Sequence, residues 1–168
     1  MTKRISYIIL VFFTLVGEIY SQPPLQITGK FIVDKGNLEN TEIRIVKDFN
    51  PFSTIYPERA KFSFNLEYNS NYLIVFSKDG YISKKVAIDT HAPEEVIPDG
   101  FAPYIFDVTL FKQYEGVNTL VFDKPIGKIT YDDQKEDFVY DEEYTKSIQN
   151  ELDKIQKQIE KKREEEER

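Results

Sequence analysis

The sequence predicts a mainly β protein, a seven-stranded antiparallel β-sandwich followed by a charged C-terminal α-helix. Three observations lead to this prediction. Segments of alternating apolar and polar residues recur at roughly ten-residue spacing between residues 27 and 122, which is typical of short, half-buried strands. The period changes to that of an amphipathic helix only from residue 141. The 168 residues are 40% hydrophobic and 14% aromatic, enough for a packed core.

Individual strands follow from the alternation. The predicted strands cover residues 27–33, 42–47, 62–68, 72–76, 81–89 and 104–110, and residues 119–122 are the candidate for a seventh. Residues 72–76 are apolar on both faces, so we expect this strand to be central. Two connections contain several prolines, and we therefore expect residues 49–57 and 91–103 to be irregular.

Composition excludes several classes of function. A net charge of −7 argues against a nucleic-acid partner, because binding phosphates needs a basic surface. The chain has no cysteine, which excludes disulfides, thiol nucleophiles and thiolate zinc sites. His91 is the single histidine, so no centre can use two imidazoles. We expect no cofactor and no bound metal.

The N-terminus has the pattern of a Sec-type signal peptide over residues 1–21. Lys3 and Arg4 precede an apolar stretch, residues 5–16, and the small Ser21 follows at the expected cleavage site. The alternative is an uncleaved anchor, but the apolar stretch is too short to span a bilayer core of roughly 30 Å. We therefore expect an exported protein with no transmembrane span after cleavage, in the periplasm or peripheral on an envelope complex.

Four segments of residues 22–122 resemble the carboxypeptidase regulatory-like domain family: Ile27-Thr28-Gly29-Lys30, Phe62-Ser63-Phe64-Asn65-Leu66, Tyr72-Leu73-Ile74-Val75 and Ser77-Lys78-Asp79-Gly80-Tyr81. The resemblance covers residues 25–112. It implies a transthyretin-like (prealbumin-like) sandwich of seven strands, common in exported proteins of Bacteroidota, and no catalytic residues. The sequence departs from the family at residues 50–59, where a longer loop replaces the usual glycine-rich turn and offers a contact surface.

Residues 123–168 differ from the sandwich region. We expect residues 123–140 to form a strap or hairpin around an acidic turn, and residues 141–168 to form a charged amphipathic helix with a frayed end after residue 159. One apolar stripe runs along that helix: Tyr144, Ile148, Leu152, Ile155 and Ile159. Two interpretations stay open, since the stripe can pack on the sandwich of the same chain or join a partner helix as a short coiled coil.

No set of residues matches a catalytic motif, so we expect a protein that is not an enzyme. The acidic residues between 132 and 143 lack the spacing of a calcium loop, and a solvated acidic turn is the preferred interpretation. The primary hypothesis is a cell-envelope adaptor that binds envelope proteins through the helical stripe, within a secretion or surface-motility complex. The alternative is a carbohydrate-binding sandwich that uses loop aromatics: Phe49, Phe52, Tyr56 and Tyr104.

Overall fold

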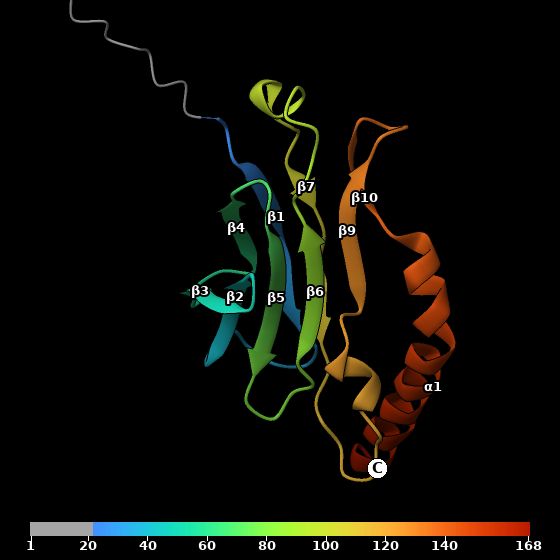
Figure 1. The fold of residues 1–168 in the computed structure, drawn as a ribbon. Helices are drawn as coiled ribbons and strands as arrows, with labels where there is room; N and C mark the ends of the chain where they lie inside the picture. The colour runs from blue at the N-terminus through green and yellow to red at the C-terminus, as the bar shows by residue number, and fades with distance from the viewer. Residues whose placement is uncertain (1–21) are drawn as a thin grey trace, which may run out of the picture.

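The computed structural model describes residues 22–168, so the predicted signal peptide lies outside the described residues. Two stacked sheets and a long C-terminal helix make up the fold (Figure 1). The elements are β1 (Leu25–Val33), β2 (Thr41–Lys47), β3 (Asn50–Ile55), β4 (Lys61–Leu66), β5 (Asn71–Lys78), β6 (Lys84–Asp89), the 3-10 helix η1 (Ile97–Asp99), β7 (Tyr104–Ile105), β8 (Val108–Leu110), the 3-10 helix η2 (Leu120–Asp123), β9 (Gly127–Asp132), β10 (Asp137–Tyr140) and α1 (Glu142–Glu166). The prediction of a mainly β protein with one C-terminal helix is confirmed.

The sheets are larger and more mixed than the sequence predicted. The small sheet has the order β4-β1-β7, with β8 also paired to β1, and the large sheet has the order β10-β9-β6-β5-β2-β3. Pairs β1/β7, β1/β8 and β6/β9 are parallel. The prediction of seven antiparallel strands is therefore wrong in number and direction, with ten strands in the described residues. Residues 34–103 separate β1 from β7, and residues 90–126 separate β6 from β9, so both connections are long enough for the crossovers that parallel pairs need.

Three segments differ from the strands and loops predicted from the sequence. Residues 49–57 contain the strand β3, because Pro51 is tolerated on the outer edge of a sheet where no further ladder forms. The predicted strand over 104–110 is split into β7 and β8, and residues 120–123 form η2 instead of a strand. Residues 127–140 form a hairpin that extends the large sheet through the β6/β9 pair, so they belong to the sandwich.

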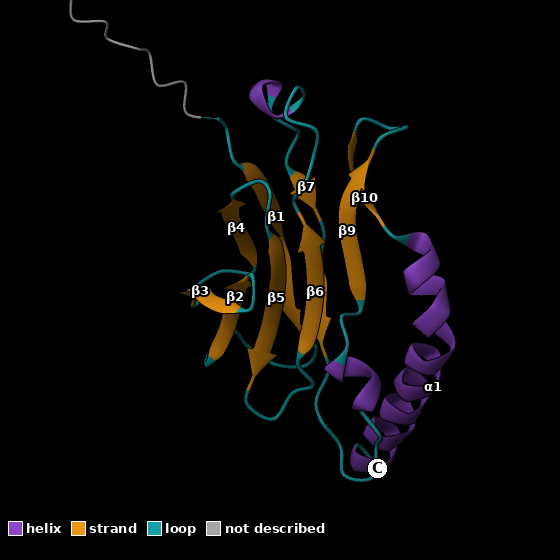
Figure 2. Cartoon of the chain, in the orientation of Figure 1, coloured by secondary structure: helices purple, strands orange, loops and turns teal. Residues whose placement is uncertain are grey.

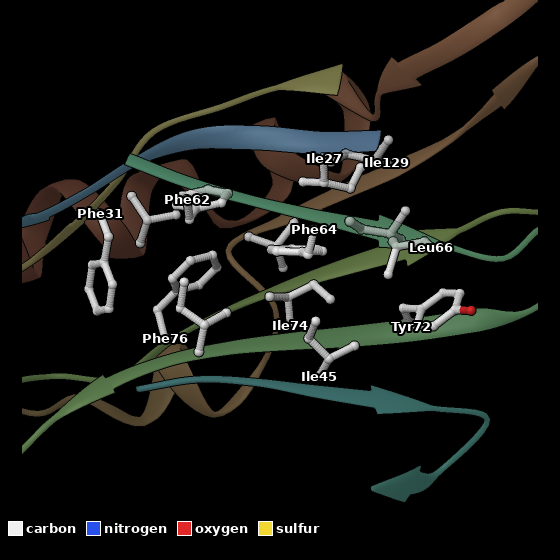
Figure 3. Close-up of a cluster of buried hydrophobic side chains, with 14 of the residues drawn as sticks. Ile27, Phe31, Ile45, Phe62, Phe64, Leu66, Tyr72, Ile74, Phe76 and Ile129 are labelled. Carbon is white, nitrogen blue, oxygen red and sulfur yellow. The ribbon is translucent and has the colours of Figure 1, made fainter. Parts of the chain in front are cut away.

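The core lies between the two sheets and consists of inward-facing aromatic and aliphatic side chains (Figure 3). The Phe76 ring from the large sheet lies 5.4 Å from the ring centroids of both Phe31 and Phe62 on the small sheet. Alternation along β4 buries Phe62, Phe64 and Leu66 and exposes the residues between them. Because side chains alternate along each strand, the apolar residues of both sheets point into one common core.

The loop that precedes β7 packs on the β9–β10 hairpin. The Phe101 ring lies 4.9 Å from the Phe138 ring centroid and 5.8 Å from that of Tyr131. These contacts fix a proline-rich segment that has little regular structure of its own.

A glycine in the first strand lets the chain between β7 and β8 approach β1. A Cβ at Gly29 would lie 1.6 Å from the Phe106 carbonyl oxygen and 2.8 Å from the Phe62 ring. The Phe106 amide donates to the Thr28 carbonyl at 3.1 Å, which holds the backbone at this distance.

Substitution Gly29→Ala should therefore destabilise the sandwich. A methyl group at this position must displace backbone as well as a buried ring, and we expect a loss of about 2–3 kcal/mol in the free energy of unfolding. Urea denaturation measures this loss. The control is Ser63→Ala on the exposed face of β4, which should change stability by less than about 0.5 kcal/mol. An equal effect of the two variants would contradict the proposed role of Gly29.

Candidate functional site

The apolar stripe of α1 packs against its own chain. Asp141 caps the helix by accepting a hydrogen bond from the Tyr144 amide at 2.8 Å. The stripe residues Ile148, Ile155 and Ile159 are buried, and Tyr144 and Leu152 are partly buried beside them. Their partners are Ile82 from the connection before β6 together with Val121 and Phe122 of η2.

This packing is the one expected if the stripe packs on its own chain. Figure 2 shows α1 along the β9 side of the large sheet, with its C-terminal half near η2. The five predicted partner-binding residues are brought together, but in an intramolecular core. A partner helix would have to displace η2 before it could contact them.

The charged end of α1 is held to the sandwich by three ion pairs. Arg163 lies 3.3 Å from Asp34, Lys112 lies 2.6 Å from Glu166, and Lys35 pairs with Glu167. The hydrogen bond that Glu167 accepts from Lys35 lowers the pKa of Glu167, and the hydrogen bond that Lys112 donates to Glu166 raises the pKa of Lys112. The helix therefore continues to Glu166, and the expectation of a frayed end after residue 159 is wrong. Sequence alone could not pair these side chains with residues more than fifty positions away.

Lys84 lies beside the cluster that the stripe of α1 forms with Ile82, Val121 and Phe122. Its Nζ lies 4.5 Å from the centroid of the Phe111 ring and 5.9 Å from that of Phe122. Burial lowers the pKa of Lys84 to about 8. The aromatic faces compensate part of the cost of burying the cation.

The outer face of the large sheet is open between the β2–β3 hairpin and α1. Figure 1 shows no element in front of β5, β6 and β9 on this side. A groove of about 500 Å³ crosses it, with Val46, Leu73 and Ala87 on its floor and Lys128 and Asp141 at the helical end. We call this the hairpin groove.

Phe49 borders the hairpin groove from the tip of the β2–β3 hairpin. Its side chain is 99% exposed. Asp48 and Phe49 both have positive φ, 46° and 66°, as in a two-residue type I′ turn that normally prefers Asn-Gly or Asp-Gly. The tip is held in place because the Asp48 amide donates to the Asn71 carbonyl at 2.8 Å and its carboxylate accepts from the Asn71 amide at 2.9 Å.

A second groove of about 720 Å³ lies further along the same face, and we call it the Tyr56 groove. Tyr56 follows β3 and is 72% exposed. Polar side chains line this groove and are fixed by mutual contacts: the Ser77 hydroxyl donates to Glu42 at 3.1 Å, and Arg44 lies 3.7 Å from Glu42. Arg44 and Val46 are alternate residues of β2, so the two grooves share one sheet face.

The structure separates the four aromatic candidates for ligand binding. Phe49 and Tyr56 border the two grooves, at opposite ends of β3. Phe52 is 45% exposed, but its ring packs edge-on against Tyr72 at 5.9 Å and lies under Lys47. Tyr104 is partly buried against the main core and lines neither groove. Sequence reasoning missed the polar residues of the Tyr56 groove, since strand pairing alone brings them to one face.

Two further results concern residues 22–168. Within this range, no three His, Cys, Asp or Glu side chains gather closely enough to hold a metal ion. None of the helices in the described part of the chain has the length and apolar character of a membrane span.

No protein-family model and no curated protein matches this sequence.

Removing a buried stripe residue should test the intramolecular packing of α1. Substitution Ile159→Ala leaves a cavity beside η2, and we expect the free energy of unfolding to fall by about 2–4 kcal/mol. The isolated chain is measured by urea denaturation, with Lys157→Ala on the exposed face of α1 as the matched control. Equal stability of the two variants would show that the stripe does not pack in the isolated chain.

Stability should depend on the protonation of Lys84. Its folded pKa of about 8 lies below the ordinary 10.5, so the unfolded state binds more protons between these values. The free energy of unfolding should therefore rise with pH from about 8 towards 10, by an amount on the order of 2–3 kcal/mol. Substitution Lys84→Met should remove the rise and stabilise the protein at pH 7. Urea unfolding at pH 7 and 9.5 measures both, with Lys85→Met as control, and a rise that survives in Lys84→Met would contradict this assignment.

Proposed function

We propose that this chain is a non-catalytic binding protein of the cell envelope, an exported adaptor whose recognition surface is the outer face of the large sheet. One observation carries the proposal: Phe49 is fully exposed and has a left-handed backbone conformation. A bulky residue with positive φ costs about 1–2 kcal/mol, and an exposed ring gains nothing from burial. Residues retained against both costs mark functional positions.

The open face beside Phe49 supports the same proposal. The hairpin groove gives the ring a neighbouring apolar floor, and the contacts of Asp48 hold the backbone of the turn that carries it in place before a partner arrives. Pre-organisation of this kind reduces the entropy that binding must overcome. The helical stripe offers no comparable free surface, because it is packed on η2.

Export and the domain family belong to the proposal on the strength of the sequence. We assign the sandwich to the carboxypeptidase regulatory-like, transthyretin-like type of Bacteroidota, with a cleaved signal peptide over residues 1–21. Two features of the fold support the assignment: Gly29 of the first motif sits at a close backbone approach, and Gly80 of the last motif has a φ of 77° in the turn after β5.

Substitution Phe49→Gly tests the proposal. Glycine adopts this turn without strain, and we expect stability to be unchanged or to rise by about 1 kcal/mol, while binding to the envelope is lost. The measurement is co-sedimentation of the purified chain with isolated cell envelopes, together with urea unfolding.

The matched control is Ile105→Ala. Ile105 is likewise an exposed apolar residue, at 72%, but belongs to β7 on the opposite sheet, so its removal should leave co-sedimentation unchanged. Full envelope binding by Phe49→Gly, or equal losses in the two variants, would refute the recognition surface. Cleavage of a glycan or peptide by the purified protein would refute the non-catalytic assignment.

A further inference from the structure

Two aromatic side chains, Phe49 and Tyr56, stand at opposite ends of β3 on one sheet face. Their rings border the hairpin groove and the Tyr56 groove. Seven residue steps at about 3.3 Å each, shortened by the bulge in the β2/β3 pair, separate them by roughly 20 Å along the strand. A ligand that contacts both rings must therefore be extended.

From this arrangement we propose that the outer face binds an uncharged, extended polysaccharide, with sugar rings stacked on Phe49 and Tyr56. The inference rests on the proposed function and names the ligand of that same surface. The apolar C–H face of a pyranose ring packs on the negative face of an aromatic ring. Hydroxyl groups of the sugars between the two rings then bond to the polar residues on the floor.

The floor between the rings has the groups that sugar hydroxyls need. The Glu42 carboxylate already accepts from Ser77 and pairs with Arg44, so all three side chains are fixed in place. Arg44 is half exposed and carries five N–H donors, more than this ion pair uses. Both grooves are shallow parts of an open sheet face, which suits a linear polymer.

The charges that line the two grooves favour an uncharged ligand. The basic residues are Arg44, Lys78 and Lys128, and the acidic residues are Glu42, Glu58, Asp79, Asp89 and Asp141. The lining is therefore slightly negative, in a chain with net charge −7. Acidic polymers such as uronates or nucleic acids would be repelled.

Two features disfavour a protein or peptide ligand. Residues that dominate protein interfaces cluster at the centre of a desolvated patch, but the two exposed rings lie about 20 Å apart with polar residues between them. Addition of a peptide strand would use the free edge of β3, where Pro51 lacks the N–H that a ladder needs.

Affinity electrophoresis tests the inference. The purified chain runs in native gels that contain an uncharged glucan, xylan or mannan, or the acidic polymers alginate and polygalacturonate. We expect retardation by at least one uncharged polysaccharide, insensitive to salt, and at least tenfold weaker in Phe49→Ala and in Tyr56→Ala. Oligosaccharides too short to span both rings should bind at least tenfold more weakly than the polymer.

The control Ile105→Ala should run as the unmodified chain does, and thermal unfolding checks that all variants are folded. The inference is overturned if no uncharged polysaccharide retards the chain, if only acidic polymers do so, or if Ile105→Ala is affected equally. If retardation fails while Phe49→Gly still loses envelope binding, the ligand is a protein and the proposed function stands. If both fail, the recognition surface itself is refuted.

Discussion

The packing of aromatic rings between the two sheets is the constraint on which the rest of this structure depends. The rings of Phe31 and Phe62 each lie 5.4 Å from that of Phe76, and Gly29 allows the chain at Phe106 to close over them. Because side chains alternate along a strand, fixing these residues inward also fixes which residues face outward. Val46, Leu73 and Ala87 reach the open face of the large sheet for this reason.

A second, smaller core attaches the C-terminal helix. The stripe of α1 does not close over the main core but packs on η2 and Ile82, and the Lys84 ammonium lies against the rings of Phe111 and Phe122 in this second core. Ion pairs at Asp34, Lys35 and Lys112 then hold the last helical turns. Exposed ion pairs of this kind contribute little energy each. The apolar contacts therefore supply most of the energy that docks α1 on the sandwich, and the ion pairs fix the position of the helix along it. Because α1 is held on the β9 side, it borders one end of the open outer face of the large sheet.

The β2–β3 hairpin is the place where local preferences and the observed structure disagree. An Asp-Gly or Asn-Gly pair would suit its turn, yet the sequence has Asp48-Phe49 and leaves the ring in solvent. The neighbouring residues make this conformation stable, since Asp48 is bonded to Asn71 through both its backbone and its carboxylate. The conformational cost is confined to Phe49, and the strained turn places its aromatic ring beside the hairpin groove.

The sequence by itself determined the β character, most strand positions, the amphipathic helix and the residues of its stripe, because these depend on periodicities of two and 3.6 residues. It also placed Phe49 and Tyr56 among the candidate aromatics. Tertiary structure alone decided the parallel pairing of β6 with β9, the strand status of β3, the partner of the helical stripe and the exclusion of Tyr104 from the open face. These outcomes depend on contacts between residues far apart in the chain, such as Arg163 with Asp34. Local periodicity carries no information about such contacts, so only the folded chain could reveal them.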